Sequence, residues 1–170
     1  MKSYLYQDEV GKYFQYSDCV ILNWPRQSGK TFYSTYLINE FLLKNGFKKG
    51  AIFSLGIFLS IFDSKFFDSM GEDVNDQILH KSENGVEYKN RSKLLWHSIR
   101  STAMIGTAFD FIVFDEYLSY DTNNALNKII PNLSIGAKII FTGTPGNMSI
   151  QQKVVKFLNT NKIKYFIHKL

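Results

Sequence analysis

The sequence has little of the residue types that small proteins use as covalent or metal crosslinks. Its one cysteine, Cys19, excludes an internal disulfide and any cysteine-based zinc cluster. The histidines His80, His97 and His168 lack the spacing of metal ligands. No apolar run approaches the roughly 18 residues that span a membrane, and the N-terminus carries no signal-peptide pattern. We therefore expect an intracellular protein with no structural metal and no membrane partner, in which Cys19 is a small buried side chain.

Acidic side chains are absent from the last third of the chain. Residues 1–121 carry 13 basic and 15 acidic side chains, a net charge of −2, whereas residues 122–170 carry seven lysines and no acid, a net charge of +7. A surface whose charged side chains are all positive predicts an acidic partner, with nucleic acid as the first candidate. A lysine-rich surface that only meets solvent explains the same bias equally well.

Apolar runs of strand length alternate along the chain with helical patterns. A length of 170 residues with 45% apolar content suits one globular domain. Short apolar strands between helices predict an α/β fold with a mainly parallel central sheet flanked by helices, whose ligands bind at the carboxyl ends of the strands. The expected helices are Thr31–Asn45 and Ile57–Met70, and the expected strands are Cys19–Trp24, Ala51–Leu55, Gln77–His80, Gly85–Tyr88, Leu94–Ser98, Phe109–Phe114, Ala137–Phe141 and Ile163–Ile167.

The segment from Trp24 to Thr31 has the features of a phosphate-binding loop. It follows the apolar run Cys19–Leu22 and ends in Gly29-Lys30-Thr31, where the expected helix begins. In such a loop, backbone N–H groups and the helix N-terminus face the phosphates, Lys30 reaches the β- and γ-phosphates, and Thr31 gives its hydroxyl to Mg²⁺. Trp24, however, stands where a glycine usually lies, six residues before the lysine. Taken alone, the segment is either a variant loop or no phosphate site.

Two adjacent carboxylates follow the apolar strand Phe109–Phe114. Asp115 would hold Mg²⁺ through water, because that ion keeps part of its hydration shell. Glu116 would orient and deprotonate an attacking water. An Asp-Glu pair after a strand is more often a simple turn. Its position 85 residues after Lys30 favours nucleotide hydrolysis instead.

A third apolar strand ends in Thr142-Gly143-Thr144-Pro145. Taken alone, this is a strand followed by a turn. As the third member of an ordered set, it predicts that a threonine hydroxyl, with Thr144 as the candidate, contacts the γ-phosphate or the water and reports hydrolysis to the rest of the protein.

Together these motifs resemble the ATPase domain of the large terminase subunit, the DNA-packaging motor of tailed phages. That family has a variant loop in which Arg-Gln precedes the final x-Gly-Lys-Ser/Thr and the early glycine is dispensable, which accounts for Trp24. The family's adenine-reading glutamine matches Gln7 in Tyr6-Gln7, although a glutamine on a helix surface is nearly as good an interpretation. The nucleotide-binding residues that the resemblance implies are Gln7, Pro25, Arg26, Gln27, Ser28, Gly29, Lys30, Thr31 and Asp115, and the catalytic ones are Glu116, Lys30, Arg26, Arg100 and Thr144.

The resemblance implies a P-loop NTPase of the RecA-like, ASCE type that uses ATP and Mg²⁺. Hydrolysis would drive double-stranded DNA into a procapsid through sequence-independent contacts with the phosphate backbone. The expected partners are the portal and procapsid and further copies of the chain in a ring, and the expected location is the host cytoplasm at the portal. Because no acid follows Asp121 to form a nuclease metal site, we expect residues 1–170 to be a single ATPase domain without a nuclease domain.

The arginines leave the source of the catalytic positive charge open. The family commonly has Arg-Gly before the acidic strand, whereas this chain has Ile105-Gly106. Arg26 would act on the γ-phosphate in its own subunit, or would hold the loop by pairing with a carboxylate. Arg100 would act on a neighbouring subunit in a ring, or would be a surface residue.

Two other functions fit the same motifs. The first lobe of a superfamily 2 helicase also has Thr-Gly-Thr-Pro after an Asp-Glu strand, but it needs a second lobe and seldom has Arg-Gln in its loop. A module that binds ATP only to dock a partner would not need Glu116 as a base.

Overall fold

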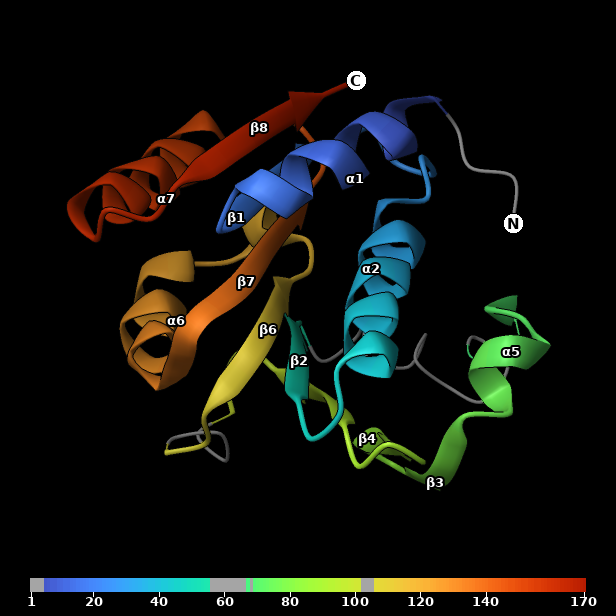
Figure 1. The fold of residues 1–170 in the computed structure, drawn as a ribbon. Helices are drawn as coiled ribbons and strands as arrows, with labels where there is room; N and C mark the ends of the chain where they lie inside the picture. The colour runs from blue at the N-terminus through green and yellow to red at the C-terminus, as the bar shows by residue number, and fades with distance from the viewer. Residues whose placement is uncertain (1–4, 56–66, 68, 102–105) are drawn as a thin grey trace.

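The computed structural model describes residues 5–55, 67, 69–101 and 106–170 (Figure 1). The helix expected over Ile57–Met70 and the position Ile105 lie largely or wholly outside these residues, so both remain sequence-based expectations. In the described chain, no helix is long and apolar enough to cross a membrane.

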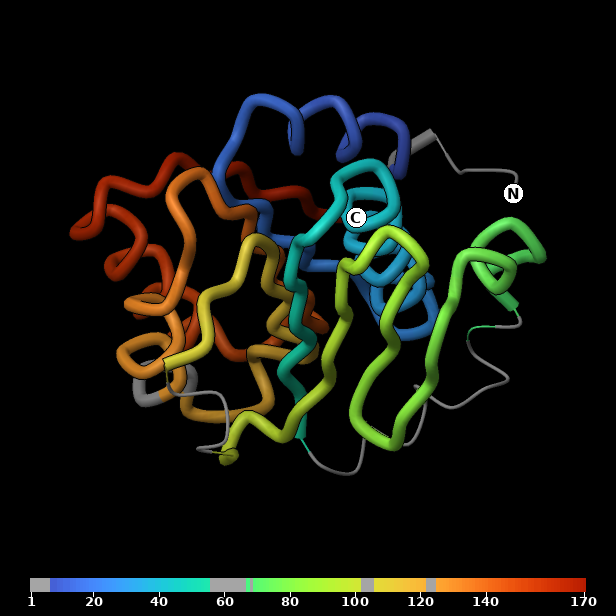
Figure 2. The backbone as a smooth tube through the Cα atoms, turned by 60° about the horizontal axis from the view of Figure 1, so that its bottom comes forward, coloured from blue at the N-terminus to red at the C-terminus, as the bar shows by residue number. Residues whose placement is uncertain are grey.

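Strands of the described chain form one sheet in the order β3-β4-β5-β2-β6-β7-β1-β8. The six strands from β5 to β8 in that order run parallel to one another. β3 and β4 form an antiparallel hairpin at the opposite edge from β8, as Figure 2 shows. The strands are β1 (Cys19–Asn23), β2 (Lys49–Ser54), β3 (Ile78–Ser82), β4 (Gly85–Tyr88), β5 (Lys93–Ser98), β6 (Phe109–Phe114), β7 (Leu133–Gly143) and β8 (Tyr165–Lys169).

Helices cover both faces of the sheet. α1 (Leu5–Tyr16) and α2 (Lys30–Lys44) pack on one face, and α6 (Thr122–Ile129) and α7 (Met148–Thr160) pack on the other (Figure 1). Successive strand residues alternate between two buried clusters, because side chains of a strand point to opposite faces. The predicted α/β fold with a mainly parallel, helix-flanked sheet is confirmed. The short elements are α5 (Glu72–Asn75), η1 (Tyr117–Ser119) and η2 (Ile130–Asn132).

The observed limits of β7 and β8 differ from the predicted ones. β7 begins at Leu133, four residues before the predicted start, and it includes Gly136 at φ 76°. The pairing of β7 with β6 shifts register near that segment. β8 begins two residues later than predicted and continues to Lys169. The sequence analysis assigned no helix to α1, α6 or α7, although α7 has a buried apolar side through Val154 and Leu158.

α2 approaches the sheet closely at Gly50 of β2. A Cβ at this position would lie 2.7 Å from Cδ1 of Ile38 and 3.1 Å from Cδ1 of Leu42, both of which are fully buried. The missing side chain therefore lets α2 lie against the centre of the sheet. This contact fixes the position of α2 on the sheet, and α2 begins at Lys30.

We expect Gly50→Ala to lower the free energy of unfolding by about 1–3 kcal/mol, since the methyl group must displace Ile38 in a close-packed core. Urea denaturation measures this change. Gly146→Ala is the matched control, because an added Cβ there meets nothing within 4 Å and the two variants share the entropic effect on the unfolded chain. Equal stability of the two variants would contradict the packing argument.

Candidate functional site

The loop between β1 and α2 lies at the carboxyl edge of the parallel strands. Its residues 25–27 and 29 are exposed, and Gln27 and Gly29 adopt left-handed backbone conformations with φ of 61° and 78°. The Ser28 hydroxyl donates to the carbonyl of Pro25 at 2.8 Å, within the loop itself. No side chain caps the N-terminus of α2. The positive end of this helix dipole is therefore available to an anion, as a phosphate-binding loop requires.

Trp24 takes the place of the usual glycine by turning away from the loop into the core. Its side chain is fully buried, with its ring stacked on that of Tyr33 at a centroid distance of 5.9 Å. Its indole N–H donates to Nδ1 of His168 in β8 at 2.8 Å, which places the imidazole proton on Nε2. That Nε2 lies 3.6 Å from the carboxylate of Glu9 in α1. The tryptophan thus anchors the start of the loop to β8 and leaves the phosphate side open.

Lys30 and Glu116 form an ion pair at the centre of the site. Nζ of Lys30 lies 2.8 Å from Oε1 of Glu116, and the two side chains are 6% and 19% exposed. The same Nζ donates to Oγ1 of Thr144 at 3.0 Å. The backbone N–H of Thr144 lies 3.3 Å from Oε2 of Glu116. Three residues that the sequence placed in separate motifs therefore share one cluster of contacts.

Next to that cluster, Asp115 accepts hydrogen bonds from two threonine hydroxyl groups. Thr31 donates to its Oδ1 at 2.9 Å and Thr142 donates to the same oxygen at 2.6 Å. Asp115 is 1% exposed, so burial raises its pKa above the ordinary aspartate value, while the hydrogen bonds from Thr142 and Thr31 lower it. A buried carboxylate of this kind favours a nearby cation.

The oxygen atoms of Thr31 and Asp115 are of the kind that Mg²⁺ prefers. Oγ1 of Thr31 and Oδ1 of Asp115 are 2.9 Å apart. An ion bound directly by the Thr31 hydroxyl would therefore lie close enough to Asp115 for the carboxylate to hold one of its waters. No group of three or more His, Cys, Asp or Glu side chains that could hold a metal occurs among the described residues. An ion held here would therefore complete its shell with water and phosphate oxygens.

The turn after Asp115 holds Glu116 in an unusual backbone conformation. Glu116 has φ 51° and ψ 42°, and its N–H donates to Oγ1 of Thr142 at 3.2 Å. The next residue, Tyr117, is fully buried and donates its hydroxyl to Oδ1 of Asn23 at the end of β1, at 3.0 Å. A Cβ on Gly143 would lie 2.9 Å from the Tyr117 ring. The glycine of the third motif thus makes room for a tyrosine that links the acidic turn to β1.

Gln7 lies near the loop but contacts α2 through its backbone. The Tyr33 hydroxyl, in the first turns of α2, donates to the carbonyl of Gln7. Gln7 is 6% exposed, so it is not the helix-surface glutamine of the alternative interpretation. It lines one end of a groove of about 750 Å³ between α1 and α2. The structure therefore places this side chain beside the loop's helix, while its adenine-reading role stays a prediction.

The two arginines predicted to act in catalysis lie outside the central cluster. Arg26 is exposed in the loop and forms no ion pair with a described residue, so the carboxylate partner needed for a loop-holding role is not found in the described part of the chain. Arg100 is exposed two residues after β5. β5 lies four strands from β1 in the sheet, about 19 Å at 4.8 Å per strand. Arg100 is thus far from the loop of its own subunit.

Sequence reasoning missed the residues that support the site. Thr142 was noted only as part of the third motif, although it bonds Asp115 directly. Asn23 and Tyr117 were not singled out. Asn23 could have been noticed as the one amide at the end of an otherwise apolar strand. The Tyr117 contact depends on tertiary packing, and no local pattern indicates it.

Solved structures of phage terminases resemble this fold. The large terminase of a thermophilic bacteriophage superposes with a TM-score of 0.78 at 14% identity, over 99% of this chain and 46% of that chain. The HK97 bacteriophage large terminase gives 0.77 at 12% identity, over 99% and 39%. The ATPase domain of a Thermus phage large terminase gives 0.70 at 17% identity, over 85% and 66%.

The chain therefore spans less than half the length of the first two of these proteins. At such identities the likeness shows the fold alone. No curated protein matches the sequence.

A family comparison of the sequence covers the site itself. Residues 21–157, which include the loop, the acidic turn and the third motif, match the family described as "Terminase large subunit, T4likevirus-type, N-terminal". The match extends over more than three quarters of the 170 residues. The chain belongs to this family of terminase large subunits.

Proposed function

We propose that this chain is an ATP-hydrolysing motor domain that moves double-stranded DNA into a viral procapsid. The observation that carries the proposal is the cluster of Lys30, Glu116 and Thr144, with Thr31 and Asp115 beside it. These are the groups that phosphoryl transfer requires: a cation for the phosphates, a base for water and oxygen ligands for Mg²⁺. The family match supports the packaging role, and the helicase alternative is not favoured.

Related structures support ATP as the nucleotide. The thermophilic-phage terminase described above has been solved in complex with ADP and with ATP-gamma-S, and both structures superpose on this chain with TM-scores above 0.7. In this chain the loop backbone and the uncapped α2 N-terminus would bind the β- and γ-phosphates. The side chain of Gln7 would read the adenine.

The Lys30–Glu116 ion pair brings the proposed phosphate-binding cation and the proposed base into one contact. A γ-phosphate in the loop would draw Nζ of Lys30 away from Glu116, because a phosphate carries more negative charge than a carboxylate. When Lys30 turns to the phosphate, the Glu116 carboxylate is released to accept a proton from the attacking water. Mg²⁺, when bound by Thr31 and Asp115, would neutralise phosphate charge as the transition state forms.

Thr144 connects this chemistry to the rest of the chain. It bonds both Lys30 and Glu116, so the loss of their ion pair changes its contacts directly. Three residues later, Asn147 caps α7 by accepting from the N–H of Ile150 at 3.3 Å. A change in the contacts of Thr144 on hydrolysis would thus be transmitted to α7 through Pro145 and Gly146.

Assembly completes the proposed motor. Arg100 follows β5, which lies four strands from β1 in the sheet, and this suits action on a neighbouring subunit in a homo-oligomeric ring. Arg26 would act within its own subunit. We place residues 1–170 as one ATPase domain that works in the host cytoplasm at the portal of the procapsid.

We expect Glu116→Gln to lower kcat for ATP hydrolysis by about 10²–10⁴-fold, since it removes the base. The same change should strengthen ATP binding, because the amide no longer competes for Lys30. Steady-state phosphate release and titration with a fluorescent ATP analogue measure the two effects. Lys30→Ala is the control that loses both binding and turnover.

Two results would count against this mechanism. If the parent protein and Glu116→Gln hydrolyse ATP at the same rate, Glu116 is not the base. If the parent binds ATP without turnover in the presence of DNA and procapsids, the chain is a nucleotide-gated docking module.

The contact between Gly143 and Tyr117 supplies a separate prediction. Gly143→Ala places a methyl group 2.9 Å from the Tyr117 ring and should displace the turn that carries Glu116. We expect kcat to fall by roughly 10- to 100-fold with a smaller change in KM for ATP, as for other misplacements of a catalytic group by about 1 Å. Gly146→Ala, in open space nearby, should keep the parent rate. An unchanged kcat in Gly143→Ala would show that Tyr117 does not position Glu116.

A further inference from the structure

The solvent side of α7 and the turn that follows it form a lysine face, defined here as Gln152, Lys153, Lys156, Asn159, Thr160 and Lys162, all exposed. The opposite side of α7 is buried through Val154 and Leu158. Every side chain of the lysine face is cationic or carries a neutral amide or hydroxyl group. The helix contains no acidic residue, and none follows Asp121 in the whole chain.

The lysines of this face have no carboxylate partner in the described chain. By contrast, Lys44 pairs with Glu40 at 2.7 Å, and the half-buried Lys93 pairs with Glu87 at 3.2 Å. Lys49 and Lys89 are also exposed without an ion pair to a described residue, so the distinguishing feature of the face is that its lysines gather on one helix and the turn after it. Lys153, Lys156 and Lys162 make no ion pair with a described residue. Their charge is therefore available to a partner in solution.

We propose that the lysine face binds the phosphate backbone of double-stranded DNA; this rests on the proposed motor function. The exposed stretch of α7 from Gln152 to Thr160 is about 12 Å long at 1.5 Å per residue. One DNA strand presents a phosphate about every 3.4 Å along the axis, so the helix spans three to four phosphates. Ammonium, amide and hydroxyl donors contact phosphate oxygens without reading base sequence.

The competing partner is a protein, because a hollow of about 370 Å³ along α7 has a mostly apolar surface. The charge of the face favours DNA instead. Stable protein interfaces have a centre from which charged residues are depleted, whereas this face carries three lysines and no acid.

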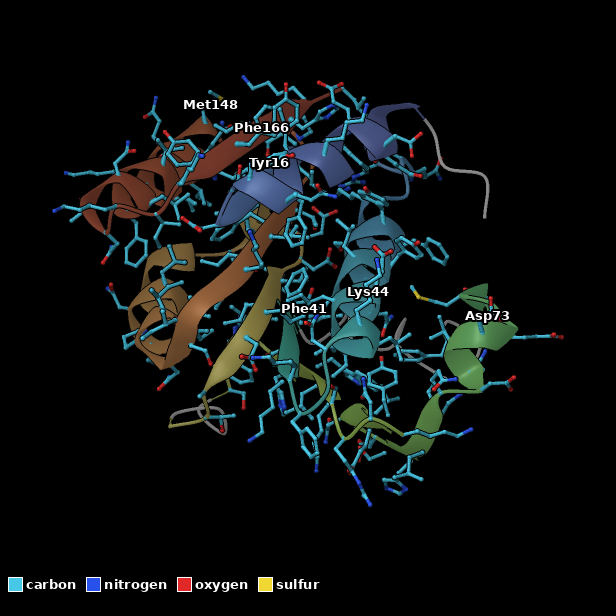
Figure 3. All side chains as sticks on the ribbon, viewed as in Figure 1. Tyr16, Phe41, Lys44, Asp73, Met148 and Phe166 are labelled. Atoms are coloured by element: carbon cyan, nitrogen blue, oxygen red, sulfur yellow. The ribbon has the colours of Figure 1, made fainter. Side chains whose placement is uncertain are left out.

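The place of α7 in the chain explains why DNA contact there would be useful. The helix begins at Met148, four residues after Thr144, and Figure 3 shows Met148 beside β8 at one side of the molecule. A rearrangement of Thr144 on hydrolysis therefore reaches the DNA-bearing helix through a very short connection. The lysine face would be the element that moves with the nucleotide state.

The test compares two charge-matched triple variants. One is Lys153→Gln, Lys156→Gln and Lys162→Gln. The control is Lys49→Gln, Lys81→Gln and Lys89→Gln, which removes the same charge from exposed positions on β2, on β3 and just after β4. Binding to a 30-base-pair duplex, with a non-hydrolysable ATP analogue present, is followed by fluorescence anisotropy as the salt concentration is raised.

We expect the α7 variant to lower the slope of log K against log salt by about 2.7, since each phosphate contact contributes about 0.9. The affinity at low salt should fall by about tenfold or more, whereas the control should keep the parent slope. Basal ATPase activity should be unchanged in both variants, because none of these lysines lies in the site.

Equal salt slopes for the parent and the α7 variant would overturn the proposal that the lysine face binds DNA. Equal losses of DNA affinity in the two triple variants would overturn it too. Neither result would contradict the proposed motor function. If the parent hydrolyses ATP but shows no salt-dependent binding to duplex DNA, the translocation part of the proposed function fails as well. Loss of basal ATPase activity in the α7 variant would show that these lysines serve the fold or the site instead.

Discussion

The parallel alignment of β6, β7 and β1 as neighbours is the constraint on which the site depends. Val113 pairs with Ile140, and Ile140 pairs with Val20, so the three strands run in register to the same edge, where β6 ends two residues before β7 and β1. The loop, the acidic turn and the third motif are up to 114 residues apart in sequence, yet they meet at this edge. A shift of β7 by one residue would turn Thr142 away from Asp115 and break the contact at 2.6 Å.

Charge balance in the site follows from that alignment. Lys30 and Glu116 neutralise each other in a poorly exposed position, where an isolated charge of either sign would be costly. Asp115 is deeper, and among the described residues its carboxylate is stabilised by two hydroxyl groups and the nearby ammonium. In the function proposed above, phosphates and a cation would offset the cost of burying these charged groups.

The sequence predicted the fold class and the three motifs because each depends on a local signal. Fully apolar strands indicate a covered parallel sheet, and Gly29-Lys30-Thr31 and Asp115-Glu116 follow such strands directly. The supporting contacts were not predictable in this way. Trp24 looked like a defect of the loop, and only its burial against Tyr33 and His168 shows that it anchors the loop instead. Gly143 looked like a turn residue, and its role in admitting Tyr117 is visible only across the sheet.

The central claim is that nucleotide replaces the Lys30–Glu116 ion pair and frees Glu116 for catalysis. A crystal structure with Mg²⁺ and a non-hydrolysable ATP analogue tests it most directly. The account predicts Nζ of Lys30 within hydrogen-bond distance of the β- and γ-phosphates, Thr31 and Asp115 at the metal, and Glu116 turned to a water beside the γ-phosphate. A bound nucleotide that leaves Lys30 paired to Glu116 at 2.8 Å, or that lies away from this loop, would contradict the account.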